Sequence, residues 1–104
     1  MLDKAAAKQL AGQYAEAVRN TLNPKSVILF GSYANGIPHE CSDIDIAVVF
    51  DGLEDNWLDT AASLYCIRRK VSGAVNAGIE PHLMDEQYDR SGFLEHIKKT
   101  GELI

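Results

Sequence analysis

The sequence is poor in cysteine: it contains only Cys41 and Cys66, and their spacing matches no metal-binding motif. We expect both to be free thiols, as is typical of a cytoplasmic protein. The N-terminus lacks the basic and apolar segments of a signal sequence. The longest apolar runs, 27–30 and 46–50, are far shorter than the roughly 20 residues that a membrane-spanning helix needs. We therefore expect a cytoplasmic protein with no membrane-spanning segment.

Positive charge is also scarce, since 10 Lys and Arg face 15 Asp and Glu, for a net charge of −5. Extended binding of DNA or RNA depends on clustered Lys and Arg, so this composition argues against it. An acidic protein still binds a nucleoside triphosphate when divalent ions supply the positive charge. With 104 residues, 46% of them hydrophobic, the chain is expected to form one domain over residues 1–104.

The apolar patterns predict a small α/β fold. An apolar residue recurs every four positions over 2–22, with Asp3 placed as the N-cap, which predicts a first helix. Strands are predicted at about 26–30, 44–50 and 79–84. Helical segments are predicted at about 32–35, 57–75 and 92–100, the last of them capped by Asp85 or Ser91. This order predicts a small mixed sheet with helices packed mainly on one face.

Asp43 and Asp45 stand at the start of the second predicted strand, separated by Ile44. Because side chains on a strand alternate between its faces, both carboxylates should point to the same side. Such a pair can hold two Mg²⁺ ions about 3.5–4 Å apart, one activating an attacking hydroxyl and the other binding the leaving phosphates. The alternative is structural: Asp43 as a turn residue and Asp45 as a solvated outward position.

Gly31 and Ser32 directly follow the first predicted strand. Gly31 allows the backbone to approach a phosphate, and Ser32 can begin a helical turn whose N–H groups and hydroxyl bind phosphate oxygens. By itself, a Gly-Ser pair after a strand is more often an ordinary turn. Its weight comes from the ten residues that separate it from Asp43. Together the two motifs predict nucleotidyl transfer.

Glu80 is the candidate for a third acidic ligand, because it shares one face of the third predicted strand with His82 and Met84. It would complete one metal site or help to deprotonate the acceptor hydroxyl. The alternative is an ordinary glutamate at the sheet edge, a position that Pro81 favours. On the face of Glu80, His82 would contact the nucleotide or orient the Glu80 carboxylate, unless it has only a surface or partly buried structural role.

The other basic and histidine residues are weaker candidates. Arg68, Arg69 and Lys70 would reach a triphosphate from the helix, or form a solvated cluster that the C-terminal helix dipole favours. His39 and His96 lack the spacing of a zinc site, so neither is expected to bind metal.

Residues 31–36 (Gly-Ser-Tyr-Ala-Asn-Gly) and 42–46 (Ser-Asp-Ile-Asp-Ile) resemble the DNA polymerase beta type nucleotidyltransferase superfamily. Within it, the chain is most similar to the minimal nucleotidyltransferases that pair with HEPN proteins in prokaryotic toxin–antitoxin modules. Residues 79–82 resemble the segment that carries the third acidic residue of the family. The resemblance covers almost the whole chain and implies a fold like the polymerase beta palm.

The resemblance implies a role for each motif residue. Gly31 and Ser32 would bind the triphosphate of ATP, and Asp43 and Asp45 would bind both the nucleotide and two Mg²⁺ ions. Glu80 would complete one metal site. This sequence departs from the family in two places: Asn35 stands where many members carry a basic residue, and Glu80 replaces the commoner aspartate.

The function implied is that of an antitoxin enzyme that transfers AMP from ATP to a hydroxyl on a HEPN-type partner protein. One alternative is a module without catalytic activity that neutralises its partner by contact. Another is a transferase that acts on a small molecule such as an aminoglycoside. Both homo-oligomers and hetero-oligomers remain open.

Overall fold

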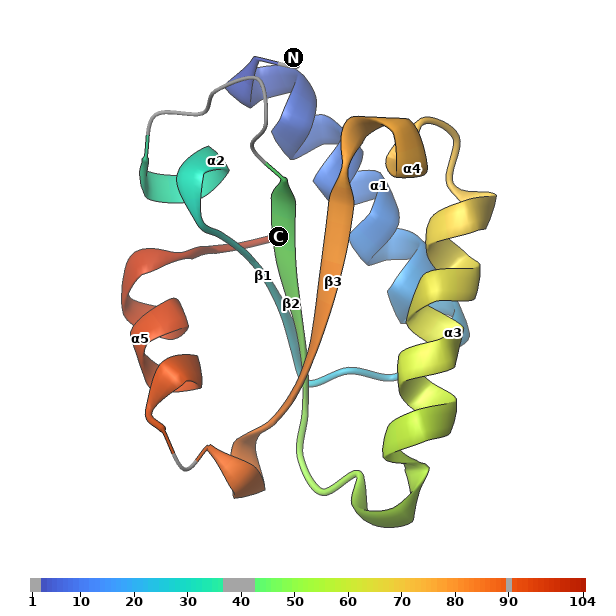
Figure 1. Cartoon of the computed structure of the whole chain (residues 1–104), viewed down its shortest axis with the longest axis vertical. Helices are drawn as coiled ribbons and strands as arrows, with labels where there is room; N and C mark the ends of the chain where they lie inside the picture. Colours follow the sequence, from blue (N-terminus) through green and yellow to red (C-terminus); the bar gives the residue numbers. More distant parts are fainter. Residues whose placement is uncertain (1–2, 37–42, 90) are drawn as a thin grey trace.

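The structure, a computed structural model, describes residues 3–36, 43–89 and 91–104. Its four strands form one mixed sheet in the order β3-β2-β1-β4 (Figure 1). The strands are β1 (Ser26–Phe30), β2 (Ile44–Phe50), β3 (Ile79–Asp85) and β4 (Glu102–Leu103). β1 pairs antiparallel with β2 and β4, whereas β2 and β3 run parallel. The predicted mixed α/β fold is confirmed, and Pro81 lies on an edge strand as predicted.

The first helix, α1 (Lys4–Thr21), begins and packs as its sequence pattern predicts. The Asp3 carboxylate accepts a hydrogen bond of 2.7 Å from the backbone N–H of Ala6, which satisfies one free donor of the first turn. Its buried face consists of small residues around one aromatic: Ala7, Ala11, Tyr14, Ala15 and Val18. These small side chains allow the helix to approach the sheet closely.

The connection from β2 to β3 differs from the prediction. One helix was predicted over 57–75, but the chain forms α3 (Trp57–Lys70) and then a separate short helix, α4 (Ala74–Ala77). Val71 has extended backbone angles, and Gly73 adopts a left-handed conformation with φ of 84°. These two residues end one helix and redirect the chain into the next, so the prediction of a continuous helix was wrong.

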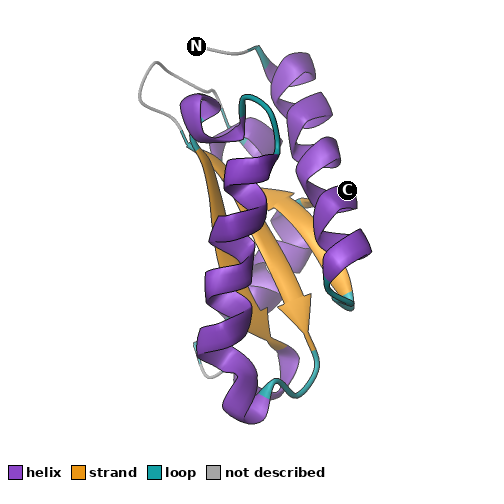
Figure 2. Ribbon diagram, turned by 90° about the vertical axis from the view of Figure 1, so that its right-hand side faces the viewer, coloured by secondary structure: helices purple, strands orange, loops and turns teal. Residues whose placement is uncertain are grey.

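The two faces of the sheet are covered differently. One face packs against α1, α3 and α4 through alternate strand residues: Val27, Leu29, Ile44, Ile46, Val48 and Ile79. The other face carries Ile28, Phe30, Ala47 and Val49, which pack against Leu94 and Ile97 of α5 (Phe93–Thr100). Figure 2 shows helices in front of the sheet and behind it. Most helices therefore lie on one face, as predicted, and α5 covers part of the other.

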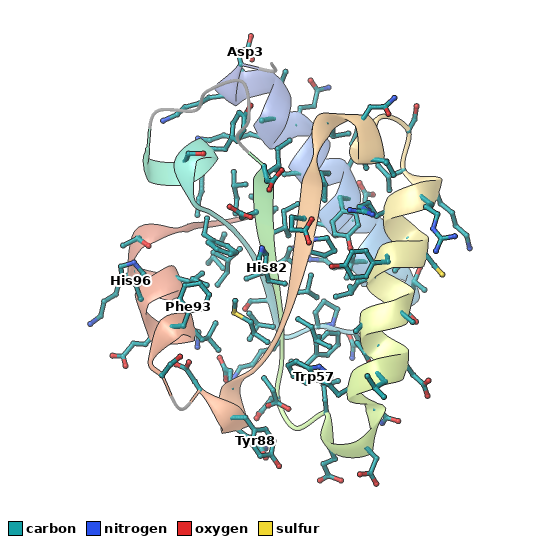
Figure 3. The ribbon with its side chains drawn as sticks, in the orientation of Figure 1. Asp3, Trp57, His82, Tyr88, Phe93 and His96 are labelled. Carbon is teal, nitrogen blue, oxygen red and sulfur yellow. The ribbon has the colours of Figure 1, made fainter. Side chains whose placement is uncertain are left out.

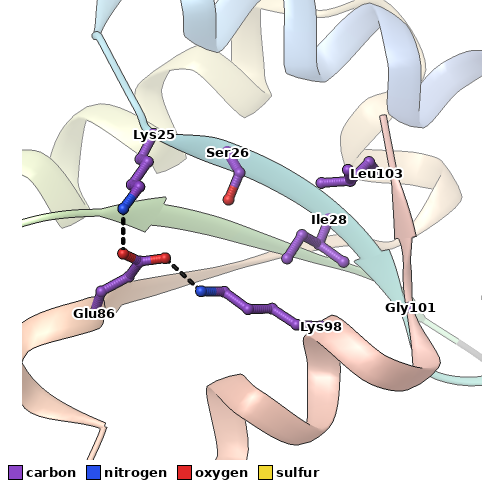
Figure 4. A pocket seen from close by; sticks show the side chains of 7 residues that line it. All are labelled: Lys25, Ser26, Ile28, Glu86, Lys98, Gly101 and Leu103. Carbon is purple, nitrogen blue, oxygen red and sulfur yellow. Dashed lines mark hydrogen bonds and ion pairs between the residues drawn. The ribbon is translucent and has the colours of Figure 1, made fainter.

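Helix α5 is held in place by two acidic residues that precede it. Glu86, in the 3-10 turn η2 (Glu86–Tyr88), accepts hydrogen bonds from Lys25 at 2.6 Å and from Lys98 (Figure 4). The Asp89 carboxylate accepts from the N–H groups of Leu94 and Glu95, at 3.0 and 3.1 Å. These contacts fix α5 over only one part of the second face.

Of the two predicted caps of this helix, only one contacts it. Ser91 Oγ accepts from the N–H of Phe93 at 3.3 Å. Asp85 does not cap α5, because its carboxylate binds the N–H groups of Gly52, Leu53 and Gln87. Asp85 therefore closes the loop after β2, together with the 3-10 turn η1 (Glu54–Asn56) that leads into α3.

Two further predictions concern cysteines and membranes. Cys66 is an exposed free thiol, as predicted, whereas Cys41 lies outside the described residues. Among the helices that the structure describes, none has the length and apolar character needed to cross a membrane.

Candidate active site

The chain turns sharply where β1 ends, at the predicted phosphate-binding motif. Gly31 has φ of 79° and ψ of −155°, a conformation that residues with a Cβ avoid, and the four-residue helix α2 (Ser32–Asn35) begins directly after it. A Cβ on Gly31 would lie 2.6 Å from Oδ2 of Asp45. The glycine therefore brings the backbone of the turn directly against one of the candidate catalytic carboxylates.

Asp43 and Asp45 are positioned by the start of β2. The N–H of Ile44 donates to the carbonyl of Gly78 at 2.9 Å, which fixes the chain between the two aspartates. Because Ile44 is buried in the core, Asp43 and Asp45 face the opposite side of the sheet, as predicted. Asp43 is exposed and the Asp45 side chain is partly exposed. Both carboxylates are thus open to a ligand from solvent.

His82 contacts Asp45 directly. Its Nε2 lies 3.1 Å from Oδ1 of Asp45, on the neighbouring parallel strand. The ring also packs edge-on against Phe30, with centroids 5.0 Å apart (Figure 3 labels His82). The aromatic contact and the hydrogen bond together restrict the Asp45 side chain. His82 therefore contacts the Asp45 carboxylate and not that of Glu80, which was the predicted partner.

Glu80 lies beside Asp45 in the register of the sheet, but its carboxylate contacts helix α3. Oε1 accepts a hydrogen bond of 3.2 Å from the Tyr65 hydroxyl, and Oε2 lies 3.9 Å from Nη1 of Arg68. The Arg68 guanidinium stacks 4.9 Å from the centroid of the Tyr65 ring and donates to the carbonyl of Ile79 at 3.1 Å. Partial burial, and then the Glu80 charge, raise the pKa of the Tyr65 hydroxyl, which keeps it a donor.

The structure thus brings together some of the predicted residues and separates others. Gly31, Asp45 and His82 lie in contact, with Asp43 two residues from Asp45 on the same face. Glu80 is engaged by Tyr65 and Arg68 instead. Within 3–36, 43–89 and 91–104, no group of three His, Cys, Asp or Glu side chains is arranged to hold a metal ion.

Two partners of Glu80 were not predicted as such from the sequence. Tyr65 is an apolar position of the predicted helix 57–75. Arg68 was predicted either to reach a triphosphate or to form a solvated cluster, and its guanidinium lies beside the Glu80 carboxylate. Their spacing of three residues places them on one side of the helix, where both reach Glu80. His39 and Ser42 lie outside the described residues, and His96 lies on α5.

The donor set suits Mg²⁺ by its chemistry. Mg²⁺ prefers oxygen ligands and is usually held by one or two carboxylates, with water and substrate phosphates completing its coordination. Asp43 and Asp45 offer two such carboxylates on an accessible face, next to a turn that a phosphate could approach. The residues present therefore fit a Mg²⁺–triphosphate complex.

A cavity separate from the candidate active site lies beside β4, on the face of the sheet that α5 partly covers. Its volume is about 350 Å³, and Lys25, Glu86 and Lys98 line its polar wall (Figure 4). Both lysines already bind Glu86, whose pKa they lower, with Lys25 contributing most. Both lysine amino groups are thus engaged by one carboxylate, and neither Asp43 nor Asp45 lines this cavity, so it is not part of the candidate active site.

Comparison with known proteins confirms the resemblance. Residues 13–104 match the family model described as "Polymerase beta, Nucleotidyltransferase". A protein of Methanocaldococcus jannaschii named "Putative protein adenylyltransferase MJ1379" is 42% identical over 50 residues. That match spans 48% of this chain and 48% of the relative, so the chain matches about half of that protein's length.

Solved structures agree on the fold. The crystal structure of "a putative nucleotidyltransferase" from Sulfolobus solfataricus superposes with a TM-score of 0.65 and 26% identity, over 96% of this chain and 80% of that one. A mutant of the toxin–antitoxin pair MntA-HpeT gives a TM-score of 0.60 at 21% identity, over 89% and 70% of the two chains. The second likeness concerns the fold alone.

Proposed function

Because this chain belongs to the polymerase beta nucleotidyltransferase family, we propose that it is a Mg²⁺-dependent enzyme that transfers AMP from ATP to a hydroxyl. We propose further that the hydroxyl belongs to a HEPN-type toxin, for which the protein acts as an antitoxin. The observation that carries the proposal is the approach of Gly31 to the Asp45 carboxylate on the accessible face of the sheet. This approach supports the proposal that the turn would bind phosphate and the carboxylates would bind metal within one site.

Two similarities support the finer parts of the proposal. The relative named as a protein adenylyltransferase supports AMP as the transferred group and a protein as its acceptor. The MntA-HpeT pair, which shares the fold, supports a toxin as the partner. That the toxin is of the HEPN type rests on the resemblance of residues 31–36 and 42–46.

In this reaction the acceptor oxygen attacks the α-phosphorus of ATP, the bond to the β-phosphate oxygen breaks, and pyrophosphate leaves. Asp43 and Asp45 would hold Mg²⁺, which supplies positive charge to the phosphates and activates the acceptor hydroxyl. The N–H groups at the start of α2 and the Ser32 hydroxyl would bind the triphosphate. His82 would keep the Asp45 carboxylate in place through its 3.1 Å contact.

Glu80 would complete the site after a change of side-chain conformation. Its backbone already lies opposite Asp45 on the adjacent strand, but its carboxylate is bound to Tyr65 at 3.2 Å. Two of the three candidate carboxylates, Asp43 and Asp45, would thus be available to a metal ion, while the third is held at the sheet edge. Released from Tyr65, Glu80 would accept the proton of the acceptor hydroxyl or bind the metal.

The test is transfer of radioactive label to the partner protein. The protein is incubated with Mg²⁺ and the product of the adjacent gene, with ATP labelled in either the α- or the γ-phosphate. We expect label from α-labelled ATP only, and none after addition of EDTA. Transfer from γ-labelled ATP would instead indicate a kinase, and no transfer from either would refute the proposal.

Matched variants connect this activity to the site. Asp43→Asn removes one negative charge at nearly constant shape and should abolish transfer. Glu16→Gln makes the same chemical change on the exposed surface of α1 and should leave transfer intact. Equal activity of the two variants would exclude Asp43 as a metal ligand.

A second candidate function is neutralisation of the partner by contact alone. The Glu80 carboxylate is bound by Tyr65 and Arg68 and does not join Asp43 and Asp45 in one acidic cluster, which favours this candidate. The Asp43→Asn/Asp45→Asn variant would then still neutralise the toxin. Under the proposed enzymatic function the same variant would bind the toxin without neutralising it. Transfer of label to a small molecule instead of a protein would identify the third alternative.

A further inference from the structure

An aromatic groove lies where β3, η2, α3 and α5 meet. The cavity has a volume of about 200 Å³, and we name it by its apolar wall: Trp57, Met84, Tyr88, Phe93 and Leu94. Trp57, Tyr88 and Phe93 are 41%, 58% and 47% exposed, respectively (Figure 3). Large aromatic side chains are enriched in protein–protein interfaces, where they anchor in the partner. Three of them around one cavity indicate a binding surface.

The aromatic groove lies at the β3 edge of the sheet, and its wall of Met84, Phe93 and Leu94 is on the face that carries the candidate active site. The Phe93 ring lies 6.0 Å from the Phe30 ring, and the Phe30 ring lies 5.0 Å from the His82 ring, which contacts Asp45. Met84 is four residues from Glu80 on β3, about 13 Å along the strand. A protein segment seated in the aromatic groove could therefore present a hydroxyl at Asp43 and Asp45.

Trp57, which lines the aromatic groove, belongs to an acidic segment that we call the acidic rim. Glu54, Asp55 and Asp59 are exposed and flank Trp57 in the sequence. In the part of the chain that the structure describes, no ion pair joins these three carboxylates to a cation. Lys25 and Lys98, which do not line the aromatic groove, both bind Glu86. Among the described residues, these three carboxylates thus have no cation paired with them, and their negative charge attracts a positively charged partner.

We propose that the aromatic groove docks a positively charged segment bearing large apolar side chains, from the protein that accepts AMP. This inference rests on the proposed function for the identity of the partner. The acidic rim would repel the phosphates of a nucleic acid, and the net charge of −5 would repel a second copy of this chain, so neither is the expected occupant of the aromatic groove. At about 200 Å³ the cavity is smaller than the roughly 300–1,000 Å³ of typical small-molecule sites.

Trp57 provides the measurement, since it is the only tryptophan of the chain and lines the aromatic groove. Its fluorescence is followed, without ATP or Mg²⁺, during titration with a synthetic amphipathic peptide of Leu and Lys. We expect a saturable blue shift that weakens as salt is added. A Leu/Glu peptide and a Ser/Lys peptide test the charge and the apolar contacts separately. If either binds as tightly as the Leu/Lys peptide, or if no peptide binds, the inference is wrong.

Variants separate this surface from the rest of the protein. Tyr88→Ser should weaken binding of the Leu/Lys peptide about tenfold, since loss of an anchoring aromatic has an effect of this order. Asp55→Lys should weaken it as well and reduce its salt dependence. Val75→Ser removes a similarly exposed apolar side chain from α4, outside the aromatic groove, and should have no effect. Equal effects of Tyr88→Ser and Val75→Ser would overturn the inference.

The acceptor protein distinguishes failure of this inference from failure of the proposed function. Tyr88→Ser should raise the KM for the acceptor and leave the KM for ATP unchanged. Transfer of AMP that Tyr88→Ser does not alter would refute the aromatic groove as the docking site and leave the enzymatic function standing. Peptide binding without AMP transfer to any protein would refute the enzymatic function instead.

Discussion

Replacement of Gly31 by alanine should damage both stability and activity, and two other glycines allow the causes to be separated. Gly31 has φ of 79° and ψ of −155°, a region that is almost exclusive to glycine and costs other residues about 1–3 kcal/mol. The new Cβ would also stand 2.6 Å from Oδ2 of Asp45, so the carboxylate must move. For a loss of about 2 kcal/mol, we expect the Tm of Gly31→Ala to fall by roughly 8–16 °C.

Gly73 and Gly12 are the matched controls. Gly73 has φ of 84°, but no atom lies within 4 Å of the position that a Cβ would take, so Gly73→Ala should show only the backbone cost of about 1–2 kcal/mol. Gly12 lies within α1, also with nothing within 4 Å, and Gly12→Ala should stabilise the protein by about 0.5–1 kcal/mol. Gly12→Ala thus reports helix propensity and Gly73→Ala the cost of a left-handed backbone, while Gly31→Ala combines the higher cost of its own backbone region with the contact with Asp45.

The assays are thermal unfolding followed by circular dichroism and the transfer of label from α-labelled ATP. Of the three variants, only Gly31→Ala should lose transfer activity. We expect a loss of about 100-fold, since displacement of a reacting group by about 1 Å has effects of that size. Two results would refute the reasoning. Gly31→Ala as stable as the parent protein would show that the turn is not strained, and full activity would show that its approach to Asp45 is not part of the site.

Two further predictions concern buried polar groups. Burial alone would raise the pKa of Asp85, but hydrogen bonds from Gly52, Leu53 and Gln87 lower it below its ordinary value. Its contribution to stability is therefore present above the unfolded-state pKa of about 3.9 and is lost as pH falls through the lower folded-state value. Asp85→Asn should lower the free energy of unfolding by about 1.5–3 kcal/mol at pH 7. Urea titration between pH 2 and 7 should also show that the stability of this variant depends less on pH in acid. An unchanged pH dependence would contradict this assignment. The buried Tyr14 hydroxyl donates to the Leu64 carbonyl at 2.9 Å, so Tyr14→Phe should cost about 0.5–1.5 kcal/mol in the same measurement, and no loss would show that this link between α1 and α3 is unimportant.

The sequence allowed prediction of the features that depend on local periodicity. The four-residue repeat of α1 and the alternation of β2 follow from which side chains face the core, so both were predicted correctly. The same alternation placed Asp43 and Asp45 on one face of the sheet. Nothing comparable marked β4, because two residues are too few to form a pattern.

The features that sequence analysis missed depend on contacts between distant residues or on one backbone angle. The apolar stripe of α3 continues to Val71, which concealed the break that Gly73 produces. The hydrogen bond from Tyr65 to Glu80 joins residues fifteen positions apart, on a helix and a strand, and exists only once both have packed. Prediction therefore identified the carboxylates of the site but not their present partners.

The parallel register of β2 and β3 makes this site sensitive to insertions and deletions. Asp45 lies opposite Glu80, and Ala47 lies opposite His82. A slip of β3 by one residue would turn Glu80 and His82 toward α1 and α3 and bring Pro81 onto the face that carries Asp45. A single-residue deletion between α4 and β3 would thus threaten the core and the active site together. Length changes in this family should therefore accumulate in other connections, and the segment from Gly73 to Gly78 should keep a fixed length.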